Sequence, residues 1–480
     1  MNFSSIAPEI VVTALALIIL LVDLWTPAEI KPKLGYLAAL GLVVVFGLTL
    51  ARPIGAPHSA SFDGMLDVDG IALFFKRFFV VAAIAVIFMG MEFAARIADG
   101  IAEFYALTLI ALAGMMFAAS ANDLILAFVA VELISVTFYV LVSFQRARMP
   151  SLEAGVKYLI LSALSASFLV FGIALVFGVS GTTNFADLHR LAPQLVLNKA
   201  FWLGLLLILI GLSFKISAFP LQMWAPDVYQ GAPTPVTAFL AIGSKAAGFA
   251  LLMRILFIAF PLIAARWHKL FIVVAAITIL YGNLCAIPQR SLKRLLGYSS
   301  ISNAGYLLLG IAAVSASGSA AVLYYLAGYL ATLSAAFIVI CIVARNSDDI
   351  SEFAGLHRRS PALAACMALA MVSLAGIPPL AGFLGKFLLL RAVVEQGFGN
   401  HAYFWLAGIA IFGVVISIYY YFGVVRAMYW QAAPAEAGPI EYSTSMKALL
   451  GLSVAGMIYL GVCPDAFFDL TTTAVKSLRF

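Results

Sequence analysis

Long apolar runs, separated by short polar connections, follow one another along the whole chain. A run of about 20 apolar residues can cross the hydrocarbon core of a bilayer as a helix. The first run has no basic segment before it and no small-residue cleavage site, so we expect a retained helix rather than a signal peptide. The pattern predicts fourteen membrane-spanning helices, near residues 8–26, 34–51, 71–91, 104–120, 122–143, 154–179, 201–229, 234–257, 268–287, 293–314, 319–344, 360–396, 401–430 and 446–463.

Two of these runs are too long for one straight helix, and both contain prolines. Residues 201–229 would form a helix of about 43 Å at about 1.5 Å per residue, against a hydrocarbon core of about 30 Å. Pro220 lies inside this run, and Pro378 and Pro379 lie inside the run 360–396. Proline removes a helical hydrogen bond, so both runs are predicted to be broken helices.

The two predicted breaks fall at matching places in the order of the spans, because each is the fourth of five consecutive spans. Paired interruptions of this kind are typical of transporters built from inverted repeats. We therefore expect an N-terminal three-helix addition (1–100), a first five-helix repeat (101–260), a second five-helix repeat (261–430) and a C-terminal helix (431–480).

Composition agrees with this pattern. Hydrophobic residues make up 64% of the 480 residues and charged residues only 10%, whereas a soluble domain is roughly half apolar and about a quarter charged. The predicted fold class is an all-α polytopic membrane protein. The formal charge is +6, but no basic cluster is interleaved with aromatic residues, so nucleic acid is not an expected partner.

The loop charges predict the orientation of the chain. Lysine and arginine are more frequent in the loops after odd-numbered spans, and the cytoplasmic loops of membrane proteins carry such an excess. Examples are Lys31, Lys33, Arg146, Arg148 and Arg345. Both termini are therefore predicted to lie outside the cytoplasm.

The cysteines and histidines do not form a recognisable ligand set. The four cysteines are far apart without a CxxC pair, and the five histidines are widely spaced, in or near loops. Metal, haem and iron–sulfur sites need clustered ligands. We expect no metal and no redox cofactor in this chain.

Four ionisable residues fall deep inside predicted spans: Glu132, Lys215, Lys245 and Lys386. A charge at such a depth costs a few kcal/mol even on the mildest scale, about 2.5 to 3.5 kcal/mol, so it needs a partner, water or a function. Lys215 and Lys386 each belong to one of the two broken helices. We interpret the four as proton-transfer residues, with Glu132 paired to Lys215 and with water reaching Lys215 through the break at Pro220. The alternative is that these charges only fix helix packing.

Several further residues are candidates for an accessory channel. Lys157 lies one turn into its span and either connects the cavity to the cytoplasmic side or extends to the interface. Asp227 lies near the end of the first broken helix. The polar stretch "YSSISNAGY" contains Tyr298, Ser302 and Asn303, which either line a second half-channel or pack against neighbouring helices. Asp123 is expected to cap a helix.

Four stretches resemble a known family: "KYLILSALSASFLVFG", "FKISAFPLQMWAPDVYQGAPTPVTAFLAIGSKAAGF", "LKRLLGYSSISNAGY" and "AGIPPLAGFLGKF". They are similar to the antiporter-like subunits of proton-pumping NADH–quinone oxidoreductase, respiratory complex I, over about residues 100–430. The lysine in "GFLGKF" and the length of the chain make it most similar to the subunit N type. Many relatives have a histidine where this chain has Asn303, so polar hydration is expected at that position rather than titration.

The resemblance implies the function and the setting of the chain. Glu132, Lys215, Lys245 and Lys386 match the family's proton-transfer residues, and quinone reduction elsewhere in the complex drives the transfer. FMN, iron–sulfur clusters and quinone are expected in other subunits. The expected partners are a neighbouring antiporter-like subunit, small membrane subunits, protons and the lipid bilayer, in a bacterial inner membrane with periplasmic termini.

Two other functions remain open at this stage. One is a subunit of a multisubunit sodium–proton antiporter, driven by ion gradients alone. The other is a structural membrane scaffold whose charged residues only hold helices together.

Overall fold

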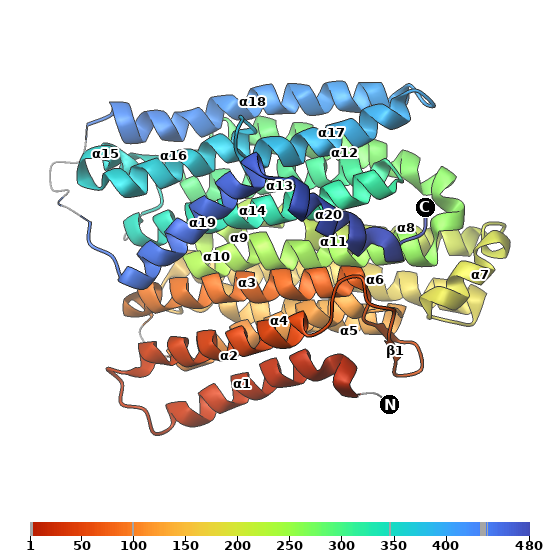
Figure 1. The fold of residues 1–480 in the computed structure, drawn as a ribbon, viewed down its shortest axis with the longest axis horizontal. Coiled ribbons are helices and arrows are strands. Elements are labelled where there is room, and N and C mark those ends of the chain that lie inside the picture. Colours follow the sequence, from red (N-terminus) through yellow and green to blue (C-terminus); the bar gives the residue numbers. More distant parts are fainter. Residues whose placement is uncertain (1–2, 98–99, 345–346, 433–437, 439) are drawn as a thin grey trace.

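The computed structural model of the chain describes residues 3–97, 100–344, 347–432, 438 and 440–480. It is a bundle of long, roughly parallel helices, with α1 (Ala7–Asp23) along one side and α18 (Ala402–Trp430) along the opposite side (Figure 1). One short hairpin, β1 (Ala60–Ser61) with β2 (Leu66–Asp67), is the sheet of the described residues. The predicted all-α polytopic fold is confirmed. Arg345, one of the loop charges used for orientation, lies outside the described residues.

Thirteen helical spans in the described chain are long and apolar enough to cross a membrane. Besides α1 and α18, they consist of α2 (Leu34–Leu50), α3 (Gly70–Phe93), α4 (Ile101–Ser120), α5 (Leu124–Val142), α6 (Met149–Ser180), α8 (Lys199–Ile216), α10 (Thr234–Phe239) with α11 (Lys245–Arg254), α12 (Ala264–Ala286), α13 (Leu292–Ala312), α14 (Ala316–Val343) and α19 (Thr444–Val462). The remaining predicted span is divided between α16 (Pro361–Ala375) and α17 (Ala381–Gly397). Each of the fourteen predicted spans therefore has a counterpart.

The polar residues between the apolar runs determine where many helices begin. The side chain of Asp69 accepts from the Ala72 N–H at 2.8 Å at the start of α3, and that of Asp123 accepts from the Ile125 N–H at 2.7 Å at the start of α5. The expected capping role of Asp123 is thus confirmed. Short acceptors of this kind satisfy backbone donors that the first turn of a helix leaves unpaired.

Three short helices lie outside the predicted spans: α7 (Phe185–Leu195), α15 (Leu356–Arg359) and α20 (Asp465–Ala474). Helix α20 packs its Phe467 ring against Phe74 of α3 and Tyr324 of α14, with ring centroids 6.3 and 5.8 Å apart. The C-terminal segment thereby joins the N-terminal helices to the centre of the bundle.

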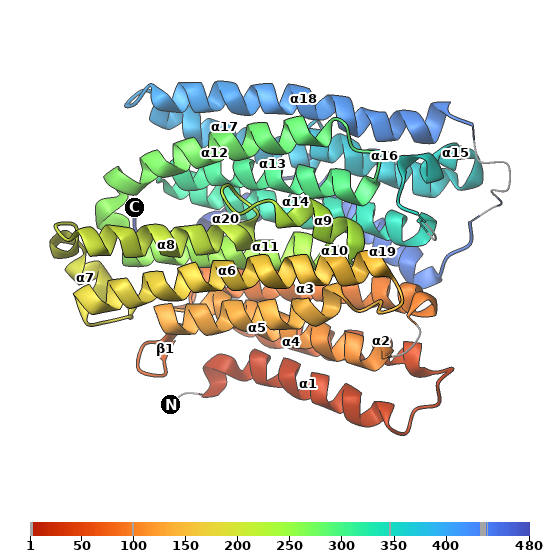
Figure 2. The same cartoon turned by 180° about the vertical axis from the view of Figure 1, so that it is seen from behind.

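Both described ends of the chain lie at the same end of the bundle, together with the hairpin and α7 (Figure 1). We call this the terminal end, and the other the opposite end. The central span Thr234–Ala259 is buried except for the partly exposed Ile258, whereas the outer helices expose apolar side chains, as expected where lipid replaces water. The reverse view again places α1 and α18 on opposite sides of the bundle (Figure 2).

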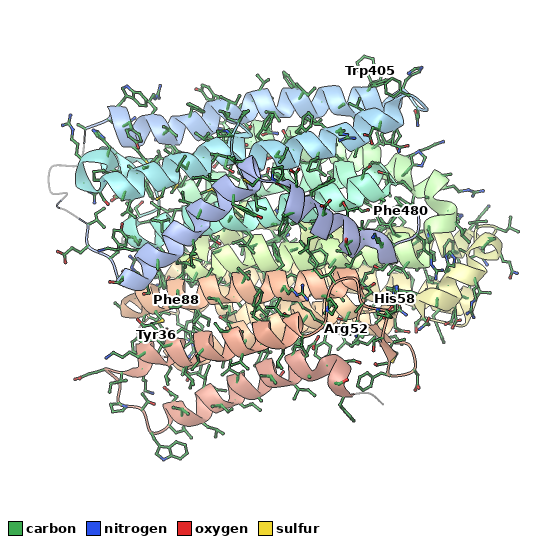
Figure 3. The ribbon with its side chains drawn as sticks, viewed as in Figure 1. Tyr36, Arg52, His58, Phe88, Trp405 and Phe480 are labelled. Carbon is green, nitrogen blue, oxygen red and sulfur yellow. The ribbon has the colours of Figure 1, made fainter. Side chains whose placement is uncertain are left out.

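Exposed tryptophans mark the ends of the outer spans. Trp405 near the start of α18 (Figure 3) and Trp430 at its end are 78% and 76% exposed, and Trp25, just beyond α1, is 78% exposed. Tryptophan prefers the boundary between hydrocarbon and head groups. The three residues therefore agree with helices that cross a bilayer of ordinary thickness.

Two buried ion pairs were not anticipated from the sequence. Lys76 of α3 bonds Glu9 of α1 at 2.7 Å, and Arg254 of α11 bonds Asp69 at 3.0 Å, with all four side chains almost fully buried. Arg254 lies near the end of its predicted span, 234–257. It is buried because the hairpin loop and α4 cover this end of α11.

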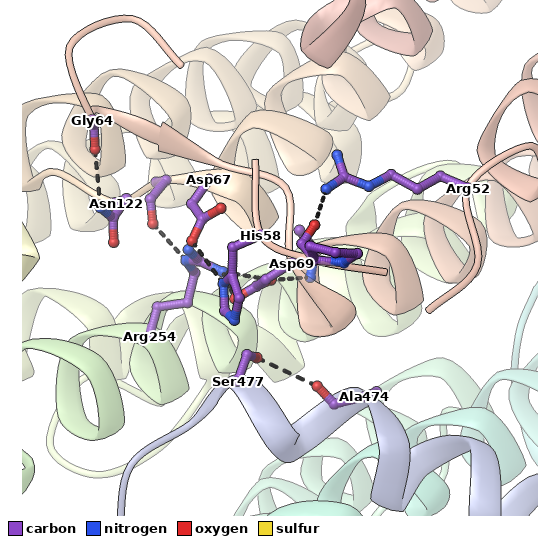
Figure 4. A network of polar contacts seen from close by, with 12 residues as sticks. Arg52, His58, Gly64, Asp67, Asp69, Asn122, Arg254, Ala474 and Ser477 are labelled. Carbon is purple, nitrogen blue, oxygen red and sulfur yellow. Dashed lines mark hydrogen bonds and ion pairs between the residues drawn. The ribbon is translucent and has the colours of Figure 1, made fainter. Parts of the chain in front are cut away.

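The Arg254 pair belongs to a polar network at the terminal end (Figure 4). Arg254 also donates to the Ala121 carbonyl at 2.5 Å, while His58 and Asp67 of the hairpin region lie 3.2 Å apart. The ligand atoms of His58, Asp67 and Asp69 gather closely enough for a metal ion, but the charge of Asp69 is already compensated by the arginine. We therefore assign the network to closing the hairpin over the helix ends.

Candidate functional site: buried lysines around two helix breaks

The first break separates α8 from α9 (Trp224–Gly231), with Pro220 between them. Ser217 follows α8 in the left-handed conformation, with φ +57°, and its N–H bonds the Phe214 carbonyl at 3.1 Å. The next N–H, of Ala218, bonds the Ser213 carbonyl at 2.9 Å. These two bonds form a Schellman motif, which pairs two of the carbonyls that the end of a helix leaves free.

Lys215 lies in the last turn of α8, and its side chain is enclosed by aromatic rings. Its Nζ donates to the Tyr158 hydroxyl at 3.4 Å and lies 5.8 Å from the ring centroids of Tyr158 and Phe214. The Trp224 indole closes the same group of rings and donates to the Phe214 carbonyl at 2.9 Å. Lys215 is 3% exposed, and its ammonium group contacts rings and a neutral hydroxyl.

Glu132 lies near the middle of α5 and is half-buried. The sequence suggested a direct pair with Lys215, but among the described residues no ion pair joins the two. The carboxylate is close enough to interact with Lys215 electrostatically. The groups in direct contact with the lysine are the Tyr158 hydroxyl and the rings of Tyr158 and Phe214.

Lys245 begins α11, directly after a π-helical turn formed by Leu240–Ser244. Its Nζ donates to the Ser300 carbonyl at 2.5 Å and to the Ser300 hydroxyl, and it is 1% exposed. Ser300 also lies 3.0 Å from the Tyr229 hydroxyl of α9. Lys245 is thereby linked through one serine to the second half of the broken helix.

Beyond Ser300, α13 carries a second group of hydrogen-bonded side chains. Ser299 bonds the Tyr421 hydroxyl at 2.5 Å, and the Asn303 amide donates to Ser299 at 3.3 Å. Tyr325 donates to the Asn303 side-chain oxygen at 2.7 Å. The ring of Tyr325 packs against the backbone of α17 at Gly385, next to Lys386.

The second break separates α16 from α17, with Pro378 and Pro379 between them. Gly376 follows α16 at φ +81°, and its N–H bonds the Ser373 carbonyl at 3.0 Å. Lys386 reaches back across this break and donates to the Leu374 carbonyl at 2.6 Å.

The Lys386 ammonium group also lies 4.7 Å from the ring centroid of Tyr306, and the side chain is 4% exposed. Like the other two lysines, it therefore contacts neutral groups. The hydrogen bond described for Lys386 is to a backbone carbonyl, that of Leu374.

A more polar group lies at the opposite end. Asp227 accepts from Lys157 at 2.8 Å and from Arg294 at 2.5 Å, and Lys157 also bonds Glu153 at 2.7 Å. These side chains line a cleft of about 190 Å³ that opens to the surface. Lys157, 42% exposed, is therefore not a buried charge but part of an ion-pair network at the mouth of the cleft.

The structure places the predicted accessory residues in different surroundings. Lys157 and Asp227 meet at the cleft, whereas Asn303 belongs to the polar group between Lys245 and Lys386. Ser302 bonds within its own helix, to the Ser299 carbonyl at 2.9 Å. Tyr298 packs against Tyr281 and against Arg294, which belongs to the ion-pair network of the cleft.

Several residues that contact or connect the buried lysines were not among the predicted site residues: Tyr158, Tyr229, Ser299, Ser300, Tyr325 and Tyr421. A signal for two of them was present, because Ser299 precedes Asn303 by one helical turn and adjoins Ser300. The tyrosines come from other helices and carry no local signal.

The fold and the site together define a class of protein: a multi-pass membrane protein of the antiporter-like, ion-translocating type. A family model described as "NADH:quinone oxidoreductase/Mrp antiporter, TM" matches residues 121–417. The chain is 38% identical to NADH-quinone oxidoreductase subunit N of Trichlorobacter lovleyi, covering 99% of this chain and 97% of that protein. It is 41% identical to NADH-quinone oxidoreductase subunit N 1 of Opitutus terrae, covering 95% and 93%.

Solved structures agree. A chain of respiratory complex I from Thermus thermophilus with bound aureothin is 30% identical, with a TM-score of 0.81 over 97% of this chain and 99% of that chain. A chain of the Mrp complex from Dietzia sp. shares the fold, with a TM-score of 0.83 at 20% identity over 100% and 98%. The chain belongs to the NADH:quinone oxidoreductase/Mrp antiporter family, among the relatives named NADH-quinone oxidoreductase subunit N.

Proposed function

We propose that this chain is the proton-translocating subunit N in the membrane arm of an NADH–quinone oxidoreductase. The observation that carries the proposal is the chemistry around Lys215, Lys245 and Lys386. Each is buried, and each donates to a hydroxyl or a carbonyl. Among the described residues none of the three forms an ion pair.

Neutral partners matter because they accept a hydrogen bond from lysine in either protonation state. A carboxylate in direct contact would favour the ammonium form and hold the proton. The buried pairs Lys76–Glu9 and Arg254–Asp69 have that arrangement, and we assign them to structure. The three lysines have the arrangement that suits proton exchange.

In the proposed path, Glu132 acts on Lys215 through the electrostatic interaction between them. Protons then pass by Tyr229 and Ser300 to Lys245, and by Ser299, Asn303 and Tyr325 to Lys386, with water completing the gaps. Lys157 and Asp227 at the cleft would supply protons from the opposite end. Tyr298 and Ser302 remain candidates for this path, with less support because of where they pack.

The wider setting belongs to the same proposal. Electron transfer would use FMN, iron–sulfur clusters and quinone in other subunits, and this chain would contact a neighbouring antiporter-like subunit and small membrane subunits. We place it in a bacterial inner membrane with periplasmic termini, because the loop charges favour that orientation and both termini lie at one end. The matching backbone of the two breaks supports the proposed five-helix repeats, 101–260 and 261–430.

The decisive experiment is NADH-driven proton pumping in membrane vesicles that contain the assembled complex with Lys215→Ala or Lys215→Arg. Arginine keeps the charge but does not release its proton. We expect both variants to lose pumping and quinone-linked NADH oxidation, while Lys269→Ala, a change at an exposed lysine of α12, leaves both unchanged. Normal rates in the two Lys215 variants of an assembled complex would contradict the proposal.

The alternative is a subunit of a multisubunit sodium–proton antiporter, since the family includes Mrp antiporters. That function predicts sodium-dependent proton exchange without NADH or quinone. The same vesicles, given a sodium gradient and no NADH, distinguish the two functions.

A further inference from the structure

An apolar groove opens on the side of the bundle where α19 and α20 cross in front of α14 (Figure 1). One wall is formed by α2 and α3, the other by α19 and α20, and α14 lies between them. The groove faces the surroundings of the bundle, because the lining residues Leu452, Leu50 and Val81 are 71%, 53% and 40% exposed. Small residues on facing helices, Ala85, Ala331 and Gly456, leave the space between the walls unfilled.

The dimensions of the groove correspond to one leaflet of a bilayer. It runs along α19 from Leu460 to Leu449, about 17 Å at about 1.5 Å per residue, and half of a hydrocarbon core is about 15 Å. Its volume is about 530 Å³. A cavity with such an apolar lining excludes water, so hydrocarbon is the expected content.

A guanidinium group stands in the lining at the end nearest the termini. Arg77 of α3 donates through Nη2 to the Thr49 carbonyl at 2.8 Å and to the Arg52 carbonyl at 2.6 Å, while its Nε is buried without a partner. The Arg52 side chain, on the adjoining loop, donates to the Pro57 carbonyl. Within the described chain, Arg77 forms no ion pair, so the groove lining contains one positive charge without an anionic partner.

We propose that this groove binds one glycerophospholipid, with an acyl chain between α3 and α19 and the phosphate against Arg77. A phosphate supplies the negative charge that Arg77 lacks, because guanidinium groups bind phosphate oxygens through several N–H groups at once. The acyl chain gains packing contacts between the walls, and such contacts drive association within a membrane, where the surroundings are equally apolar. The carboxylates of α20, Asp465 and Asp469, are exposed and do not line the groove.

A helix from a neighbouring subunit fits the groove less well. A helix seated here needs a carboxylate of its own beside Arg77, because the guanidinium group has no ion-pair partner within the described chain. A single chain of methylene groups is narrow enough to lie between the walls. The occupant is therefore assigned to lipid rather than to protein.

The test is native mass spectrometry of the full-length chain in detergent, titrated with dipalmitoyl phosphatidylglycerol or with dipalmitoylglycerol, which lacks the phosphate. We expect one phosphatidylglycerol per chain, bound about tenfold more tightly than dipalmitoylglycerol. Gly456→Leu fills the groove, because an added Cβ meets only Ala331, at 3.4 Å, and it should reduce phosphatidylglycerol binding about tenfold. Gly451→Leu, on the same helix with no atom within 4 Å of an added Cβ, is the matched control and should bind normally.

Arg77→Met tests the phosphate contact separately. It should abolish the preference for phosphatidylglycerol over dipalmitoylglycerol, and retained helicity by circular dichroism shows that the variant is folded. Equal binding by Gly456→Leu and Gly451→Leu would overturn the proposal, as would equal affinity of the normal chain for the two lipids. A protein helix occupying the groove in a structure of the assembled complex would also overturn it. None of these results depends on proton pumping.

Discussion

The two helix breaks end their first halves with the same backbone motif. Ser217 after α8 and Gly376 after α16 both adopt the left-handed conformation, and each donates to the carbonyl three residues earlier. The following N–H groups, of Ala218 and Ile377, each bond the carbonyl five residues earlier. Superposed by this motif, Lys215 of the first break corresponds to Leu374 of the second.

The breaks differ in where the lysine comes from. Lys215 belongs to α8, the helix before the first break, and its ammonium group contacts aromatic rings rather than backbone carbonyls. Lys386 belongs to the helix that begins, and it donates to the carbonyl of Leu374, the residue at the corresponding position. At the first break the indole of Trp224 donates to a nearby carbonyl instead.

This difference implies unequal roles for two buried lysines that look alike in sequence. Lys386 supports the backbone of its break, because the last carbonyls of a helix need donors. Lys215 has no such role, because the additional donor at the first break is the indole N–H of Trp224. A lysine that does not hydrogen-bond the backbone of its break can change its protonation state with little disturbance of the fold.

The largest expected effect comes from Lys386→Met compared with Lys215→Met. Both should lower NADH-driven pumping roughly fiftyfold, the equivalent of one charge moved across about 100 mV, or about 2.3 kcal/mol. Lys386→Met should in addition lower the free energy of unfolding by about 1 to 3 kcal/mol, because the Leu374 carbonyl loses its donor. Pumping by the complex and thermal unfolding of the chain in detergent measure the two effects. Equal losses of stability would erase the proposed difference between the breaks.

Next in size is Gly376→Ala compared with Ser217→Ala. Alanine at position 376 has to adopt φ +81° and places its Cβ 3.0 Å from Lys386 Cδ, so we expect a loss of stability of about 1 to 2 kcal/mol. Ser217 already has a Cβ at positive φ, and its Oγ is buried without a partner, so Ser217→Ala should be close to neutral. Thermal unfolding of the two variants side by side provides the measurement. A neutral Gly376→Ala would show that the second break tolerates a side chain as the first does.

Trp224→Phe tests the donor at the first break. Phenylalanine retains the ring but loses the N–H that bonds the Phe214 carbonyl, so stability should fall by about 1 kcal/mol. Tyr403→Phe, which removes the 2.7 Å bond to the Ala312 carbonyl far from both breaks, is a control of the same kind. If Trp224→Phe reduced pumping while Tyr403→Phe did not, the indole would serve Lys215 as well as the backbone.

The smallest expected effect belongs to Ser217→Gly. Glycine adopts the left-handed conformation without strain but loses more freedom on folding, so the net gain in stability should be about 0.5 kcal/mol. The matched change in the opposite sense is Gly376→Ser, which should destabilise. Differential scanning calorimetry of the normal chain, Ser217→Gly and Gly376→Ser would give the order of their stabilities. A destabilised Ser217→Gly would mean that the Ser217 hydroxyl stabilises the break.

Much of the fold was predictable because the length of each apolar run indicates a membrane span. Each of the fourteen spans follows from a run of residues that suits a bilayer, and both breaks follow from prolines inside runs that are too long. Helices α7 and α20 were missed because they are short and mixed in character, as in "DAFFDLTTTA". Their place depends on packing against other helices.

The site was predictable in part for a different reason. Depth in a span identified Lys215, Lys245 and Lys386 as unusual, but not what each contacts. Glu9, Asp69 and Arg254 lie near the ends of predicted spans, where sequence position does not separate buried from exposed charges, and tertiary packing buries them. The roles of the four charges and of the accessory residues stay predictions until the variants are measured.

The π-helical turns on either side of α11 have a consequence for rotation. Leu240–Ser244 precedes Lys245 and Ile255–Ala259 follows Arg254, so the ten residues of α11 lie between two widened turns. A π turn holds about one residue more than an α turn, and one residue corresponds to about 100° around a helix. If the first turn tightened and the second widened, α11 would revolve about its own axis at constant length. Lys245 would then lose its hydrogen bonds to Ser300, and the link from Lys245 through Ser300 to α9 would be broken by rotation alone.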